Sequence, residues 1–360
     1  MRDTGGMWTR LAACAITSMG CRYGFDGRAD GPVLTNPPRS TLQVRTQLST
    51  TLAEFTLPVV LDDTRADRTA MAADGSDLRF YDGDGNLLAH EIAQLGTPGG
   101  APLIAWVRVP SLSSSSAIQV DYGRATTPAA STTSPWNADV AAVYHLEEPT
   151  GSPRDATTAR LDTVATGTTT VEGQCGAGRR FLASLREALV IADAPSLALP
   201  TLTVSGWVYE DSLPPPGAYR AFVTREYATT GVNDFWLGDR AGVYYAALDT
   251  TTDGSFNFTA TPATARTWVH LALTVDSTIS RLYVNGVERA ARAVTGPVVH
   301  SPRPIIIGAD ANAGAGPDVD FVDGFIDEVK IESVARDPAW IQADYLAMRD
   351  QLIQYGPLNQ

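Results

Sequence analysis

The chain has little lysine, cysteine or histidine and no long hydrophobic run, and each shortage limits what it can be. Lys330 is the single lysine and the net charge is −13, so an acidic surface argues against binding nucleic acid. Of the 3 cysteines, Cys14 and Cys21 lie in the first 21 residues, which leaves Cys175 without a partner in the body of the chain. A disulfide-stapled scaffold and paired zinc knuckles are therefore excluded.

Motifs for catalysis are also missing. The sequence has 4 histidines, and it contains neither a Gly-x-Ser-x-Gly elbow nor a phosphate-binding loop. It has no Glu-x-Asp-x-x-Glu arrangement, and the adjacent Glu210 and Asp211 would point to opposite faces of a strand. A segment that starts like a zinc-protease helix at His90 ends in Gln94, without its second ligand. We expect no catalytic residues and no enzymatic activity.

The first 21 residues have the organisation of an export signal. Arg2 and Arg10 form a basic front, Leu11–Met19 is a short apolar run, and Cys21 follows a glycine. This order resembles a bacterial lipoprotein signal and predicts lipidation of Cys21, although Ser18 stands where such signals carry leucine. The alternatives are an ordinary cleaved signal, which would give a secreted protein, and an unprocessed start. No later segment is apolar for long enough to form a membrane-spanning helix.

The body of the chain reads as strands. In Trp268–Asp276, alternate residues from Val269 to Val275 are apolar, which is the period of a strand. Asn285-Gly286 lies between two such runs and predicts a type I′ hairpin turn. One helix is expected after Asp337, with Pro338 in its first turn and an end at Gly356. We expect its apolar stripe to dock on a sandwich.

Composition shifts divide the chain. The domains expected are a signal over 1–21 with the candidate lipidation residue Cys21, a flexible tether over 22–41, a first β-sandwich over 42–128, a linker over 129–135 and a second domain over 136–356. The linker follows from the segment rich in Thr, Ser, Pro and Ala that ends at Pro135.

Three segments of the first domain carry a family resemblance. They are Asp74–Gln94, Ala105–Leu112 and Ile118–Pro128, and with Leu57–Asp63 upstream they resemble domain of unknown function 2341. That family occurs in exported bacterial proteins, commonly ahead of a lectin-like module. The resemblance implies an architecture and no mechanism.

The second domain resembles the LamG-like, concanavalin A-type jelly rolls. The matching stretches are Val143–Glu148, Leu202–Asp211, WVHLALTVD with LYVNG, Ile305–Asp310 and Gly324–Tyr345. The fold class expected is therefore all-β, with two antiparallel β-sandwiches, the second a jelly roll with a short C-terminal helix. The loop that begins at Asp155 departs from the family pattern, because it lacks the glycine and asparagine that usually follow the aspartate.

Two aspartates are candidate ligands of a structural Ca²⁺, which takes hard oxygen ligands. Asp327 matches the family's metal-binding aspartate by resemblance, and Asp155 would contribute from the first loop. The alternative is that Asp327 accepts hydrogen bonds from backbone amides at the end of a strand.

Aromatic side chains are candidate platforms for a sugar ring. Trp236, Tyr244 and Tyr245 lie in one strand-rich segment and are expected to reach the concave face. The alternative for each is a place in the core. His145 and Glu147 share one face of the domain's first strand, where a structural pair is the simpler interpretation.

These observations predict a bacterial protein that is exported and either lipid-anchored to the cell envelope, at the outer membrane, or secreted. Its function would be non-catalytic binding or adhesion, with carbohydrate or an envelope protein as the partner of the LamG-like domain. The alternatives are a polysaccharide lyase or glycoside hydrolase of the same fold and a purely structural envelope protein.

Overall fold

The computed structural model of the chain describes residues 39–44, 48–124, 129–131, 133–226, 233–312 and 316–357. The predicted signal segment, its candidate lipidation residue Cys21 and nearly all of the predicted tether lie outside these residues. Within the described ranges, no helix is both long and apolar enough to cross a membrane.

The first sandwich contains two antiparallel sheets. One has the order β22 (Ile353–Tyr355), β1 (Arg39–Val44), β6 (Ala117–Asp121), β3 (Arg79–Tyr81), and the other has the order β2 (Leu52–Leu61), β5 (Leu103–Leu112), β4 (His90–Gln94). Phe55, Leu57, Val59 and Leu61 alternate along β2, and all four are buried in the core between the sheets. The two-residue period of the sequence therefore sets which face of β2 is covered.

The second sandwich is larger and is also antiparallel throughout. Its eight-stranded sheet has the order β19 (Val287–Ala293), β18 (Ile279–Val284), β17 (Val269–Val275), β12 (Leu202–Glu210), β21 (Gly324–Glu332), β10 (Ala177–Phe181), β9 (Thr169–Glu172), with β7 (Val140–Tyr144) also paired to β21. Its seven-stranded sheet has the order β16 (Gly254–Pro262), β15 (Val243–Thr250), β14 (Asn233–Arg240), β13 (Tyr219–Glu226), β20 (Ile305–Ile307), β11 (Leu189–Ile191), β8 (Val164–Ala165). One hydrophobic core fills the space between them. The prediction of two antiparallel sandwiches, the second a jelly roll, is confirmed.

The hairpin expected at Asn285-Gly286 joins β18 to β19. The φ angles of Asn285 and Gly286 are +52° and +74°, the two positive values that a type I′ turn requires. A side chain at Gly286 would also lie 3.0 Å from the Cβ of Tyr345, so the glycine lets the C-terminal helix pack over the turn.

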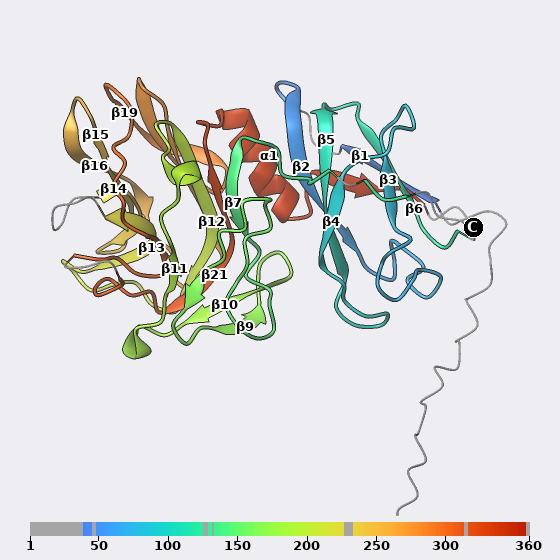
Figure 1. Cartoon of the computed structure of the whole chain (residues 1–360), viewed down its shortest axis with the longest axis horizontal. Coiled ribbons are helices and arrows are strands. Elements are labelled where there is room, and N and C mark those ends of the chain that lie inside the picture. The colour runs from blue at the N-terminus through green and yellow to red at the C-terminus, as the bar shows by residue number, and fades with distance from the viewer. Residues whose placement is uncertain are drawn as a thin grey trace, which may run out of the picture.

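That helix is α1 (Pro338–Met348). Its N-cap is Asp337, as predicted, but it ends at Met348 and not at Gly356 as expected. The carboxylate of Asp337 accepts a hydrogen bond from the backbone N–H of Trp340 at 2.8 Å. Figure 1 shows α1 between the two sandwiches. Ala343 and Ala347 lie in the core of the first sandwich, whereas Ile341 packs with residues of the second.

The chain then returns to the first sandwich, which corrects the assignment of residues 136–356 to the second domain. Ile353–Tyr355 forms β22, which pairs antiparallel with β1, and Leu352 and Ile353 are buried in the first core. The hydroxyl of Tyr355 also accepts a hydrogen bond from the backbone N–H of Val60 at 2.9 Å. Three residues suffice for this pairing because the helix delivers them to an open sheet edge.

A mixed aromatic cluster joins the sandwiches. Trp106 from β5, Trp136 just after the predicted linker and Trp207 from β12 belong to it, together with Met348 from α1. The carbonyl of Pro135 accepts a hydrogen bond from the Thr56 hydroxyl at 2.9 Å. The predicted linker thus ends in a fixed contact with the first sandwich.

Candidate functional site

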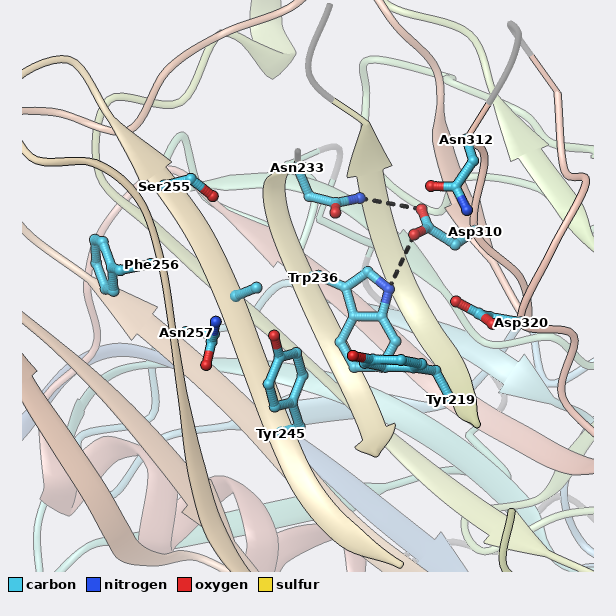
Figure 2. A pocket seen from close by; sticks show the side chains of 11 residues that line it. Tyr219, Asn233, Trp236, Tyr245, Ser255, Phe256, Asn257, Asp310, Asn312 and Asp320 are labelled. Carbon is cyan, nitrogen blue, oxygen red and sulfur yellow. Dashed lines mark hydrogen bonds between the residues drawn. The ribbon is translucent and has the colours of Figure 1, made fainter. Parts of the chain in front are cut away.

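A cavity of about 270 Å³ opens on the seven-stranded sheet, on the face turned away from the core. Figure 2 shows its lining, which combines aromatic rings with carboxylates and side-chain amides. The lining residues come from strands β13 to β16 and from the segments around Asp310 and Asp320: Tyr219, Asn233, Trp236, Tyr245, Ala247, Ser255, Phe256, Asn257, Asp310, Asn312 and Asp320.

Trp236 is placed by the alternation of β14. Its neighbours Phe235 and Leu237 point into the core, so Trp236 points to the opposite face. Gly238 lies two residues further along that face, and a Cβ there would be 2.7 Å from the six-membered ring of Trp236. The glycine therefore leaves the space in which the indole lies.

Asp310 fixes the polar end of the cavity. One carboxylate oxygen accepts a hydrogen bond from the indole N–H of Trp236 at 3.1 Å, and the other accepts one from the amide of Asn233 at 3.1 Å (Figure 2). Burial raises the pKa of Asp310 to about 6, although its hydrogen-bond donors oppose the shift. Burial, and after it the charge of Asp318, also raises the pKa of Asp320.

Three aromatic rings form the other end. The distance between ring centres and the angle between ring planes are 6.0 Å and 84° for Tyr219 and Trp236. They are 5.9 Å and 76° for Tyr219 and Tyr245, and 5.2 Å and 78° for Trp236 and Tyr245. The rings are thus mutually close to perpendicular, an arrangement in which ring edges meet ring faces. Two of the three aromatic residues predicted from the sequence, Trp236 and Tyr245, line this cavity.

The third, Tyr244, does not. It is the neighbour of Tyr245 on β15 and therefore points to the opposite face, into the core between the sheets. Its hydroxyl accepts a hydrogen bond from the backbone N–H of Thr264 at 3.2 Å. Tyr244 is a core residue, which corrects its assignment as a sugar platform.

The predicted metal ligands make contacts with backbone amides. One oxygen of Asp327 accepts hydrogen bonds from the backbone N–H groups of Gln174 and Cys175 at 2.8 and 2.9 Å. The carboxylate of Asp155 accepts them from Val143, Thr157 and Leu161. Among the described residues, no group of three or more His, Cys, Asp or Glu side chains is close enough to hold a metal ion. Calcium binding here stays a prediction, and these contacts give both aspartates a structural role.

Two family models match the chain. Residues 186–342 match that of the concanavalin A-like lectin/glucanases superfamily, and residues 74–158 match domain of unknown function 2341. The second sandwich is a concanavalin A-like domain. No curated protein matches the chain in sequence.

Solved structures with a similar fold include domains of toxins and of an enzyme. The binding domain of Paraclostridial mosquitocidal protein 1 is 14% identical with a TM-score of 0.48, and the match covers 57% of this chain and 52% of that one. Domain 4 of an extracellular arabinanase from Geobacillus stearothermophilus, solved with arabinotriose, is 18% identical with a TM-score of 0.43, over 57% and 98% of the two chains. The binding domain of botulinum neurotoxin DC, solved in complex with SialylT, is 12% identical with a TM-score of 0.45, over 59% and 52%. The match thus spans about half of each toxin chain.

The concanavalin A-like domain also contains a buried carboxyl pair. Glu210 on β12 lies near Asp239 on β14, so the pair spans the two sheets. Burial, and next the charge of Asp239, raises the pKa of Glu210 to about 8. Hydrolases of sugars use a carboxyl with a raised pKa as their acid. Here, however, the two residues are only 2% and 0% exposed, and neither lines the cavity.

His145 lies at the junction with the first sandwich. Its Nδ1 is 2.8 Å from a carboxylate oxygen of Glu328, and its Nε2 is 3.0 Å from one of Glu91. Trp136 donates its indole N–H to the same Glu91 at 2.8 Å. Glu147 is not the partner, since β7 ends at Tyr144 before both residues, and burial raises the pKa of Glu147 to about 8. The prediction of a structural pair is therefore correct for His145 but wrong in its partner.

Sequence reasoning missed the polar half of the cavity. Asn233, Asp310 and Asp320 were not singled out, since Asp310 and Trp236 are 74 residues apart and nothing local links them. Tyr219 was also missed. The alternation of residues along its strand could have placed Tyr219 on the outer face of the sheet, where it packs with Trp236.

Proposed function

We propose that this chain is a non-catalytic binding protein that recognises carbohydrate in the cavity of its concanavalin A-like domain. The observation that carries the proposal is the unit formed by Trp236 and Asp310, in which a buried carboxylate holds an indole at the edge of a cavity. A sugar ring has an apolar C–H face and a rim of hydroxyl groups. An aromatic wall with a few fixed polar groups is the complement of such a surface.

The polar groups suit hydroxyl recognition. Asp310 and Asp320 supply acceptors, whereas Asn257 and Asn312 supply both donors and acceptors. Both carboxylate oxygens of Asp310 already accept one hydrogen bond each, which fixes their direction before a ligand arrives. Such preorganisation lowers the entropic cost of binding.

The size of the cavity supports a small ligand. Its volume of about 270 Å³ is slightly below the roughly 300–1,000 Å³ of sites for drug-sized molecules. We therefore expect one or two sugar rings to enter it, with the rest of any longer chain lying on the exposed strand β16.

A glycan array followed by titration calorimetry tests the proposal. Tyr245→Ala should weaken binding of the captured glycan about tenfold or more, because aromatic residues in a recess dominate such interfaces. Trp268→Ala, at the residue before β17 of the other sheet, is the matched control and should bind normally, since Trp268 does not line the cavity. Circular dichroism must show that both variants are folded. Equal affinity of folded Tyr245→Ala and the unaltered protein would refute the site.

The catalytic and cellular parts of the proposal have separate tests. An assay for new reducing ends over a panel of polysaccharides should remain silent, and turnover abolished by one carboxylate variant would replace binding with catalysis. For export and anchoring, palmitate labelling of the unaltered chain and of Cys21→Ser should differ. Absence of label on the unaltered chain would end the lipid-anchor proposal.

A further inference from the structure

The cavity has a net negative charge that no neighbouring cation neutralises. Two carboxylates, Asp310 and Asp320, line it, and no lysine, arginine or histidine does. In the part of the chain that the structure describes, neither carboxylate forms an ion pair with an arginine, lysine or histidine. The adjacent sequence segments 227–232 and 313–315 contain no lysine or arginine either.

Two other buried carboxylates of the domain have basic partners, whereas Asp155 and Asp327 accept hydrogen bonds from backbone amides. Asp344 pairs with Lys330, and Glu332 pairs with Arg336 at 2.8 Å. Asp310 is as buried as these, at 4% exposure, and its hydrogen bonds come from neutral groups instead. A buried carboxylate is costly without a counter-charge, so a cationic ligand beside Asp310 would be favoured over a neutral or an acidic one.

The aromatic end points to the same ligand charge. Tyr219, Trp236 and Tyr245 bring three aromatic rings together at this end, and an exposed ring face attracts a cation. The rings of Tyr219 and Tyr245 already lie close to a cationic side chain. The guanidinium carbon of the exposed Arg240 lies 5.3 Å from the ring centre of Tyr219 and 5.7 Å from that of Tyr245.

We propose that the cavity binds an amino sugar with a free, positively charged amine in preference to a neutral or an acidic sugar. This rests on the proposed function and names the substrate class of the same site. The ammonium group lies between Asp310 and Asp320 on one side and the ring of Trp236 on the other. The apolar face of the sugar then meets Tyr245, and its hydroxyl groups meet the amides of Asn257 and Asn312.

Other charged groups around the cavity fit this arrangement. Asp318, whose charge acts on Asp320, lies at the acidic end, and the guanidinium of Arg186 donates to its backbone carbonyl at 3.0 Å without lining the cavity. Arg240 is at the far, aromatic end and does not line the cavity, so it is next to the tyrosines and not next to the carboxylates. An acidic sugar would face two carboxylates at short range, which disfavours uronic and sialic acids.

Three oligosaccharides with the same β-1,4-linked backbone test the inference by calorimetry on the whole chain at pH 6.5. Oligomers of glucosamine, N-acetylglucosamine and glucose differ only at carbon 2, which carries an ammonium, an acetamide or a hydroxyl group. We expect the glucosamine oligomer to bind about tenfold more tightly than the glucose oligomer. This preference should shrink as salt is added, because salt screens exposed charge.

Asp320→Asn is the informative variant. Asp320 has a φ of +54°, which asparagine tolerates well, so folding should be preserved. The variant should lose most of the preference for glucosamine, whereas its affinity for the glucose oligomer should change less, because asparagine keeps an acceptor for a hydroxyl group. Glu288→Gln, which removes one negative charge from the opposite sheet, is the control and should change neither affinity.

The outcomes are distinct. Equal binding of the three oligomers, or binding of the glucosamine oligomer that Asp320→Asn does not weaken, overturns the inference and leaves carbohydrate binding intact. Failure to bind the glucosamine oligomer also overturns it, whatever other glycans an array captures. An array silent for every glycan instead overturns the proposed function.

Discussion

Replacing Glu328 with glutamine should loosen the junction between the two sandwiches. Glu328 is 1% exposed at its side chain, and its carboxylate lies 2.8 Å from Nδ1 of His145, whose other nitrogen contacts Glu91 of the first sandwich. The imidazole is stacked at 5.3 Å on Trp106. Burial alone would lower the pKa of His145, but Glu328 and Glu91 outweigh it and raise that pKa well above the usual value.

The size of the effect follows from burial. Removing one partner of a buried ion pair costs about 3–5 kcal/mol, because the other charge remains buried without compensation. Glu328→Gln leaves a histidine with an amide in place of a carboxylate, so we expect a loss near the lower end of that range. Glu288→Gln breaks the exposed pair with Arg281 and should cost about 1 kcal/mol or less.

The loss should depend on pH in a specific direction. Because the folded pKa of His145 is raised, its stabilisation is complete below the unfolded pKa and disappears as pH rises through the folded value. Burial also raises the pKa of Glu328, so the pair loses its attraction again once acid protonates that carboxylate. The penalty of Glu328→Gln should therefore be largest near neutral pH and smaller on both sides.

Denaturant unfolding monitored by tryptophan fluorescence from pH 4 to 10 measures this penalty. The unaltered chain, Glu328→Gln and Glu288→Gln are compared at each pH. A penalty below about 1 kcal/mol at neutral pH, or one that stays constant across the range, would refute a charged histidine at the junction.

Three further changes follow from the structure. Leu352→Ala should destabilise the chain by about 2–5 kcal/mol in denaturant unfolding, since Leu352 is 0% exposed in the core of the first sandwich, and a cost near zero would contradict that placement. Gly238→Ala should destabilise the second sandwich in denaturant unfolding, because its Cβ would lie 2.1 Å from the backbone oxygen of Arg220 and 2.7 Å from the ring of Trp236, and unchanged stability would contradict this close packing. Asp310 has a folded pKa of about 6, raised from 3.8, so its contribution to stability is complete below the unfolded value and is lost as pH rises through about 6. Asp310→Asn should flatten the stability profile between pH 4 and 7, and an unaltered profile would refute the shift.

The strands and the hairpin were predictable because their signals are local. The alternation from Val269 to Val275 and the Asn285-Gly286 turn each need only a few neighbouring residues to specify the backbone. The N-cap at Asp337 is equally local, and it marks the start of α1 correctly. These features define an all-β chain with one terminal helix before any tertiary contact is known.

Contacts between distant segments were not predictable. β22 has 3 residues, and its partner β1 lies about 300 positions earlier in the chain. No local sequence pattern therefore predicts that the chain pairs with the first sandwich again. His145 meets Glu328 from 183 positions away. The same limit applies to the cavity, where β14 predicts which way Trp236 points but not that Asp310 lies beside it.

The most direct test of carbohydrate binding in the cavity is the indole N–H resonance of Trp236 during titration with a glycan. The sequence has 7 tryptophans, and Trp236→Phe identifies the signal by its loss. We expect a saturable shift of this resonance, because the hydrogen bond from the indole to Asp310 is in the cavity wall. The indole of Trp207, which donates to Met348 at the domain junction, should not move. A glycan that binds and shifts other resonances while that of Trp236 stays fixed would contradict the account.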